Sequence, residues 1–191
     1  LSYAPKPDKN KLVNIAADHL AACGYTEIMS NSLTKASYYE GLTSYKAENS
    51  VRIMNPLSAD LNVMRQTLLF NVLEAVELNV NHRNADLKLF ELGNCYYFNP
   101  EVESEENPLA RYSEKYRIAI AVTGLDAQPS WNVKAAGASF FTLRATVEKL
   151  LRRFGIDIYT LRSEPSQSDL YSDGIVYMQG TKPVIELGVV A

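Results

Sequence analysis

Residues 51–98 read VRIMNPLSADLNVMRQTLLFNVLEAVELNVNHRNADLKLFELGNCYYF, the clearest succession of patterns in the chain. A short alternating segment stops at the Asn-Pro pair at 55–56, because proline has no N–H to donate to a ladder. Apolar residues at helical spacing then predict a helix over 68–82. Residues 87–98 read as a strand, which Gly93 either interrupts or bends as a bulge. The stretch therefore predicts strand, helix and strand in succession.

The rest of the chain supplies two further helices and several strands. Residues 9–23 and 138–154 carry apolar side chains at helical spacing, and a glycine that can end a helix follows each. Further strands are predicted over 25–33, 116–123, 156–161, 174–178 and 184–190. Helices and strands do not alternate regularly, and several strand pairs have short connections. We therefore expect one α+β domain over residues 1–191, with an antiparallel sheet of about six strands flanked by helices, and not a doubly wound parallel sheet.

The composition excludes several classes of protein. The chain is 47% hydrophobic and 21% charged, with a net charge of −3. Its basic residues are scattered, and their densest group is Lys149, Arg152 and Arg153, so autonomous nucleic-acid binding is not expected. No apolar run reaches the roughly 18 residues of a membrane span, so we expect no membrane association. The sequence does not begin with Met, and we expect a fragment of a longer protein.

The sequence contains few candidates for catalytic or ligand-binding residues. Phosphate-binding glycine loops and the GxSxG elbow are absent from the sequence. Cys23 and Cys95 lie far apart, and we expect two buried free thiols in a reducing cytoplasm. His19 lies on the apolar side of the first helix, which favours a core or interface residue over a catalytic base. The acidic stretch 99–115 is expected to be a solvated loop and not a metal site. We therefore predict no catalytic, metal-binding or cofactor-binding residue in this chain.

Three blocks resemble the β chain of bacterial phenylalanyl-tRNA synthetase. They are Asn55-Pro56-Leu57-Ser58, Met64-Arg65-Gln66-Thr67-Leu68-Leu69 and Leu87-Lys88-Leu89-Phe90-Glu91-Leu92-Gly93. Upstream, Gly24-Tyr25-Thr26-Glu27-Ile28 is similar to a strand of that family, and downstream 131–141 with the following helix is similar to another segment. One departure is Leu68-Leu69-Phe70-Asn71, where the family has Leu-Leu-Pro-Gly. The resemblance covers nearly the whole chain.

This resemblance implies a fold and a role. The fold would be that of class II aminoacyl-tRNA synthetases, as a degenerate, catalytic-like module. In the family, the α chain carries the active site, and an α2β2 heterotetramer uses ATP and magnesium to join phenylalanine to its tRNA. This chain would be a non-catalytic assembly module in the cytoplasm that meets tRNA only through the holoenzyme. The alternative is a free-standing paralogue that binds a metabolite or regulates another enzyme.

The resemblance also allows a residue-by-residue test of the degeneracy. Class II modules use a Gly-Arg-x-aromatic-Arg segment whose last arginine clamps the ATP phosphate. The matching residues here run from Gly93 to Tyr97, so a tyrosine stands at the place of the clamping arginine. Tyrosine cannot supply the permanent charge or the bidentate fork of a guanidinium. A second arginine, expected after a glycine-rich strand, has no counterpart up to Ala191, so we expect no adenylation by this chain.

Two groups of residues carry the remaining expectations. By resemblance, Ile15, His19 and the strand from Tyr25 belong to the subunit-pairing region, and the isolated fragment can self-associate there as a homodimer; ordinary core positions are the alternative. The second group is structural: Asn55, Pro56, Arg65, Phe90, Glu91 and Gly93. We expect Arg65 to be partly buried against a carboxylate or strand carbonyls, since Glu91 would need such a partner if buried. The alternative is a surface Arg65, with Asn55 capping a turn.

Overall fold

The computed structural model describes residues 8–103 and 106–191, so two residues of the acidic stretch lie outside the described part. Three α-helices are present there: α1 (Lys9–Ala22), α2 (Leu69–Asn81) and α3 (Phe140–Arg153). They confirm the predicted helices near 9–23, 68–82 and 138–154. Side chains cap two of them, because Asp8 accepts a hydrogen bond from the Asn10 N–H at 2.9 Å and Ser139 accepts one from the Thr142 N–H at 3.2 Å.

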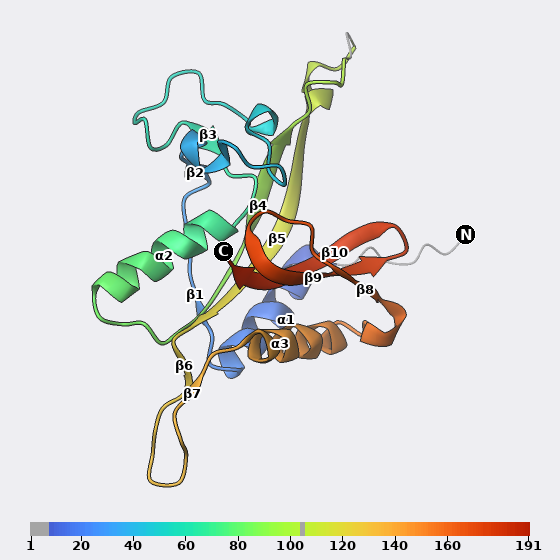
Figure 1. Ribbon diagram of the computed structural model, residues 1–191. Helices are drawn as coiled ribbons and strands as arrows, with labels where there is room; N and C mark the ends of the chain where they lie inside the picture. The colour runs from blue at the N-terminus through green and yellow to red at the C-terminus, as the bar shows by residue number, and fades with distance from the viewer. Residues whose placement is uncertain (1–7, 104–105) are drawn as a thin grey trace.

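The strands form two larger sheets instead of one (Figure 1). In the first sheet, β1 (Thr26–Glu27) pairs in parallel with β4 (Leu87–Phe98), which pairs antiparallel with β5 (Tyr112–Thr123). The second is antiparallel, in the order β10 (Lys182–Val190), β9 (Tyr171–Gln179), β8 (Arg162–Pro165). Within the described residues, no strand pairs with the outer edge of β5 or of β10. The expectation of a single antiparallel sheet is therefore corrected, while the α+β class is confirmed.

The remaining elements are short. Two small antiparallel pairs are β2 (Leu33–Thr34) with β3 (Val63–Met64) and β6 (Leu125–Ala127) with β7 (Ala136–Gly137). Single turns of 3-10 helix are η1 (Ala36–Tyr39), η2 (Ala47–Asn49), η3 (Pro108–Arg111) and η4 (Ile158–Thr160).

Four predicted strands differ from the structure. The short segment before the Asn-Pro pair forms only an isolated bridge, between Arg52 and Val63. Within the strand expected over 25–33, only the two residues of β1 and the first residue of β2 lie in strands. Between them, Ser30 bonds the Glu91 side chain instead of the β4 backbone. The strand expected over 156–161 is largely the turn η4, which starts where the Asp157 carboxylate accepts the Tyr159 N–H at 3.0 Å. Strand β4 runs through Gly93, which pairs with Arg117 without a bulge.

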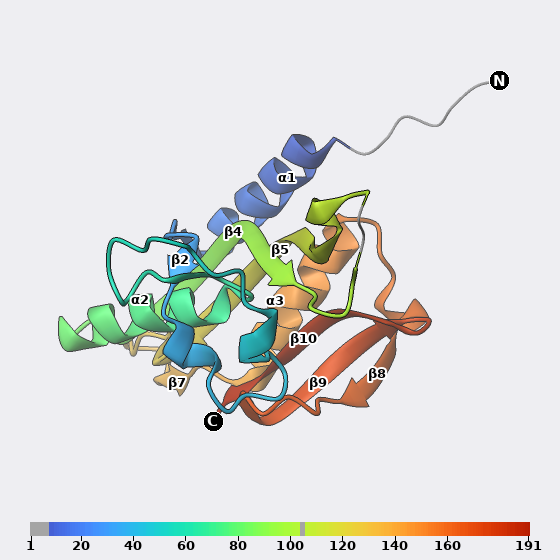
Figure 2. The same ribbon diagram turned by 90° about the horizontal axis from the view of Figure 1, so that it is seen from above.

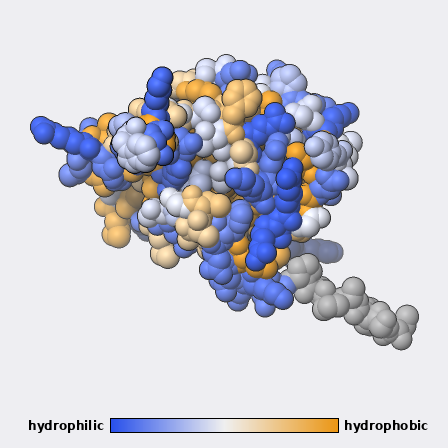
Figure 3. All heavy atoms as spheres, turned by 90° about the horizontal axis from the view of Figure 1, so that it is seen from below, coloured by the Kyte–Doolittle hydropathy of each residue, from blue (hydrophilic) through white to orange (hydrophobic). Residues whose placement is uncertain are grey.

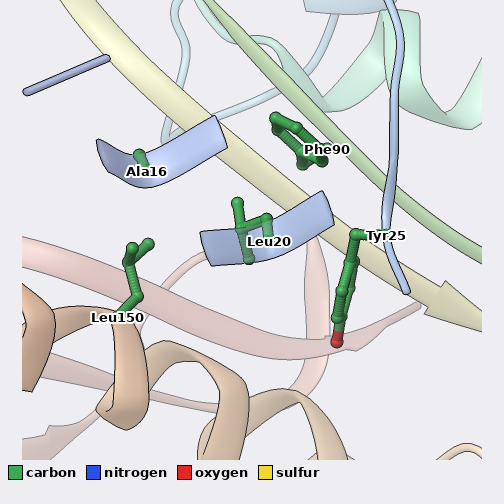
Figure 4. Close-up of a cluster of buried hydrophobic side chains, with 5 residues drawn as sticks. All are labelled: Ala16, Leu20, Tyr25, Phe90 and Leu150. Carbon is green, nitrogen blue, oxygen red and sulfur yellow. The ribbon is translucent and has the colours of Figure 1, made fainter. Parts of the chain in front are cut away.

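Two hydrophobic clusters hold α1 and α3 on the sheets, and α3 contributes to both. Ala16, Leu20, Tyr25, Phe90 and Leu150 form the first cluster, between α1, α3 and β4 (Figure 4). Val147, Leu151, Leu161, Tyr177 and Leu187 form the second, between α3 and the β8–β10 sheet. Figures 1 and 2 place α1 and α3 on one side of β4 and β5 and α2 on the other. Because side chains alternate across a strand, Phe90 faces α1 and Glu91 faces the α2 side.

On the α2 side, a loop contact joins residues that lie far apart in the sequence. The Asp169 carboxylate accepts hydrogen bonds from the Thr43 N–H at 2.6 Å, the Thr43 hydroxyl at 3.1 Å and the Ser44 N–H at 3.3 Å. The Thr43 backbone and the Ser44 side chain lower the pKa of Asp169 to about 2. The carboxylate therefore fastens the 41–46 segment to the loop before β9.

This contact predicts a dependence of stability on acid. The folded pKa of Asp169, about 2, lies below the ordinary aspartate value, so the stabilisation is present near neutral pH and is lost as the pH falls toward 2. We expect Asp169→Asn to flatten the fall in unfolding free energy between pH 4 and pH 2, measured by urea titration. Asp173→Asn, at an exposed position of β9, is the control. An unchanged acid profile in Asp169→Asn would contradict the assignment.

Candidate functional site

A buried ion pair lies at the centre of the α2 side of the sheet. The Arg65 and Glu91 side chains are only 4% and 2% exposed, and Arg65 Nη1 lies 2.6 Å from Glu91 Oε1. Arg65 follows β3 directly, whereas Glu91 stands in the middle of β4. Arg65 Nε also donates to the Asn94 carbonyl at 3.0 Å, and Nη1 to the Asn31 carbonyl at 3.4 Å. The expectation of a buried Arg65 that pairs with a carboxylate and with carbonyls is confirmed.

The carboxylate of this pair is bonded on both oxygens. Ser30 donates its N–H to Glu91 Oε1 at 3.2 Å and its hydroxyl to Oε2 at 2.9 Å. Removing two charges from water is costly unless hydrogen bonds satisfy what the partner leaves over. Here Ser30, Asn31 and Asn94 supply those bonds. The pair thus ties three separate segments together.

Gly93 makes room for the arginine. A Cβ atom at this position would collide with Arg65 Nη2 and come within 3.3 Å of Leu68. Gly93 does not have a positive φ. The glycine is therefore needed for the close approach of a side chain and not for a bulge, which corrects the expectation drawn from the sequence.

A second buried polar residue follows the arginine. The Gln66 N–H donates to the Tyr39 hydroxyl at 2.9 Å, and Gln66 Nε2 donates to the Lys46 carbonyl at 2.9 Å and the Ser50 hydroxyl at 2.8 Å. Burial raises the pKa of Tyr39 to about 12, against the effect of the Gln66 N–H. Sequence reasoning missed Tyr39 and Gln66, because no local pattern links residues some 20 to 30 positions apart in polar segments.

The Asn-Pro block is not part of this cluster. Asn55 and Pro56 lie in an exposed loop between Arg52, which bridges to β3, and β3 itself. Two apolar side chains of the same loop, Met54 and Leu57, are 94% and 104% exposed. The structure therefore brings Arg65, Glu91 and Gly93 together and leaves Asn55 and Pro56 at the surface.

The three residues assigned to subunit pairing differ in exposure. Ile15 and His19 on α1 are half-buried, whereas Tyr25 is 5% exposed and donates its hydroxyl to Thr146 Oγ1 at 3.0 Å. Burial also raises the pKa of Tyr25. Tyr25 thus belongs to the core, and only Ile15 and His19 keep accessible surface. Seen from below, hydrophobic side chains lie in separate groups between hydrophilic ones (Figure 3).

The two cysteines are in different surroundings. Cys95 is buried in β4, and this burial raises the pKa of its thiol to about 11. Cys23 is exposed after the end of α1, with its sulfur 3.9 Å from His19 Nε2. The expectation that both thiols are buried is therefore wrong for Cys23, because α1 ends at Ala22 and Cys23 caps it at the surface.

Tyr97 stands in β4 at the place where the resemblance puts a phosphate-clamping arginine. Its side chain is half-buried, and burial raises its pKa while the nearby Arg117 charge opposes the shift. The Lys115 ammonium lies 5.3 Å from the centre of the Tyr97 ring. The phenol is therefore neutral at physiological pH.

The described residues contain neither a cluster of metal-binding side chains nor a membrane-spanning helix. Among residues 8–103 and 106–191, no group of three or more His, Cys, Asp or Glu side chains is placed to hold a metal ion. In the same part of the chain, no helix is both long enough and apolar enough to cross a membrane.

The buried pair predicts a large loss of stability when one charge is removed. We expect Arg65→Met to lower the free energy of unfolding by about 3–5 kcal/mol, because Glu91 is left buried and unpaired. Urea unfolding followed by circular dichroism measures the change. Adding Glu91→Gln to Arg65→Met should recover part of the loss, since no unpaired charge remains.

The matched control is Arg162→Met. Arg162 also makes a 2.6 Å ion pair, with Glu164, but these side chains are 67% and 43% exposed. A surface pair contributes at most about 1 kcal/mol. If Arg65→Met and Arg162→Met lower the free energy of unfolding equally, the buried pair contributes no more to stability than a surface pair.

Comparison with known proteins identifies the family. A sequence model of the phenylalanyl tRNA synthetase beta chain CLM domain matches residues 2–185. The phenylalanine–tRNA ligase beta subunit of Bacteroides fragilis is 47% identical over 182 residues, which cover 95% of this chain and 22% of that protein. The corresponding subunit of Porphyromonas gingivalis is 42% identical over 178 residues, 92% of this chain and 22% of that protein.

Solved structures agree on the fold. A pyrrolysyl tRNA synthetase from Desulfitobacterium hafniense superposes with a TM-score of 0.62 at 15% identity, covering 95% of this chain and 58% of that one. At this identity the similarity shows the fold alone, which is the class II synthetase fold that the resemblance implied. The chain spans about a fifth of its curated relatives (22%), and it belongs to the phenylalanyl-tRNA synthetase β chain CLM domain family.

Proposed function

We propose that this chain is a non-catalytic module of a phenylalanine–tRNA ligase β subunit, and that it pairs with a catalytic α chain. The relatives that match it are named as β subunits of that ligase, which does not favour a free-standing paralogue. In this proposal the α2β2 assembly charges tRNA with phenylalanine at the expense of ATP, in the cytoplasm. ATP and magnesium bind the α chain, and tRNA reaches this module only within the assembly.

The observation that carries the non-catalytic part is the neutral Tyr97. Adenylate formation develops negative charge on phosphate oxygens, and fixed cations stabilise that charge. A half-buried phenol with a raised pKa cannot replace a guanidinium in this role. The buried guanidinium on the same face of the sheet, that of Arg65, is already bonded to Glu91 and to two carbonyls. Its charge is therefore not available to a nucleotide.

The pairing part is supported by helix α1. Its buried residues Ala16 and Leu20 fix it on the sheet, while Ile15 and His19 keep accessible surface beside them and Leu12 is 41% exposed. A helix that is anchored on one side and partly apolar on the other suits an interface between subunits. We place the α chain on this side of α1.

The first test is catalytic. We expect no ATP–pyrophosphate exchange with phenylalanine by a β chain that carries this module in the absence of the α chain, and exchange once the α chain is added. The assay follows labelled pyrophosphate entering ATP. Exchange by the β chain alone, abolished by a substitution such as Tyr97→Phe, would overturn the non-catalytic assignment.

The second test concerns pairing. We expect Ile15→Asp to weaken binding of the α chain at least tenfold in a titration calorimeter, because a charge in a desolvated interface costs several kcal/mol. Leu78→Asp, at a 60% exposed position on α2, is the matched control and should change binding less than twofold. Circular dichroism verifies that both variants fold. Equal affinity of Ile15→Asp and the unchanged chain would place the α chain elsewhere.

A further inference from the structure

An arm projects from the body of the molecule between β6 and β7. Residues 128–135 connect these two strands and leave the globular part as a long loop, drawn at the bottom of Figure 1. The arm carries Trp131, the only tryptophan of the chain, which is 96% exposed. Neither the role of the Arg65–Glu91 ion pair nor that of Tyr97 involves Trp131.

The base of the arm is fixed to the sheet. The Asp86 carboxylate accepts hydrogen bonds from the Leu125 N–H at 2.7 Å and from Gln128 Nε2 at 2.5 Å. Gly124, at a φ of 67°, packs so closely on Ala85 and Asp86 that a side chain would not fit. The direction in which the arm leaves the body is therefore defined by contacts at both ends of β6.

The tip of the arm is a closed turn. The Ser130 N–H donates to the Val133 carbonyl at 2.9 Å, and the Val133 N–H returns a bond to the Ser130 carbonyl at 3.4 Å. The Ser130 hydroxyl also donates to Asn132 Oδ1 at 2.9 Å. A turn that is already closed loses less conformational entropy on binding than a free loop would. Trp131 is thus presented on a preformed support.

The chemistry of the tip points to a protein pocket. Residues 127–133 contain no charged side chain, and Val133 is 44% exposed beside Trp131. Binding to a nucleic-acid backbone needs several cations, and the neighbourhood supplies only Lys134. Tryptophan, in contrast, is enriched among the residues that dominate the energetics of protein interfaces.

The arm adjoins the end of α1. Asp126, in the middle of β6, pairs with Lys88 at 2.7 Å. Both residues line a hollow of about 380 Å³ together with Cys23 and Tyr25, which follow α1, and with residues of α3. The base of the arm is therefore continuous with the α1 side of the molecule, where we place the α chain.

We propose that the arm is an anchor for the α chain, with the Trp131 indole seated in an apolar pocket of that chain. This inference rests on the pairing part of the proposed function and adds a named contact to it. The indole N–H donates to an acceptor in the pocket, since a buried indole needs such a partner. The hollow beside α1 receives side chains from the same partner.

Hydroxyl-radical footprinting of the complete β chain tests the proposal. Mass spectrometry reads oxidation of the peptide that contains Trp131 in the free β chain and in the α–β complex, and Met54 serves as an internal control on a different exposed loop. We expect at least tenfold protection of Trp131 when the α chain is added, and little change at Met54. Trp131→Ala should weaken α-chain binding at least tenfold, and Met54→Ala less than twofold.

Each other outcome contradicts the proposal in a recognisable way. If the α–β complex forms and Trp131 is still fully oxidised, the anchor proposal is wrong while the pairing function stands. If no complex forms, both the anchor and the pairing function are wrong. Protection that is already present in the free β chain assigns Trp131 to another part of that chain, or to a second copy if it depends on concentration. Protection by added tRNA without the α chain assigns it to RNA.

Discussion

The buried contact between Arg65 and Glu91 is the constraint around which the α2 side of the sheet is arranged. Because a guanidinium and a carboxylate are tolerated inside a protein only with their bonds satisfied, the surrounding backbone must bring carbonyls and N–H groups to fixed places. Asn31, Asn94 and Ser30 do so. β4 must also carry a glycine at 93, since any larger residue would displace the arginine. One ion pair thus determines the course of several segments.

The same constraint bears on function. The chain has the class II fold, yet the buried cation on this face is committed to an internal partner and the neighbouring position 97 holds a phenol. A fold does not by itself supply an activity; the charges placed on it do. In the proposed function, the module keeps the architecture of a catalytic domain for its shape and its subunit contacts, and the chemistry stays with the α chain.

The sequence predicted what depends on local periodicity and on pairing rules. The three helices follow from apolar spacing, and the burial of Arg65 follows from the need of a mid-strand Glu91 for a partner. Other features depend on contacts between distant segments, which no local pattern encodes. Asp169 meets Thr43 across 126 positions. Tyr25 packs in the first hydrophobic cluster, where its hydroxyl donates a hydrogen bond to Thr146 on α3. A glycine in a strand predicts a bulge, whereas the close approach of Arg65 that Gly93 allows depends on a contact between distant segments.

In the part of the chain that the structure describes, the outer edges of β5 and β10 are unpaired, which bears on the solubility of the protein. An open strand edge presents a row of N–H and C=O groups that a strand of another molecule can extend, which is the usual start of aggregation. On β5, the charged residues Glu114, Lys115 and Arg117 are exposed along the strand and act as gatekeepers against such growth. On β10, Val184, Val189 and Val190 are exposed. β5 likewise exposes Tyr112, Tyr116 and Ile118, and β10 also carries the exposed charges of Lys182 and Glu186. The solubility of the separated module therefore depends on the charged residues of both edges.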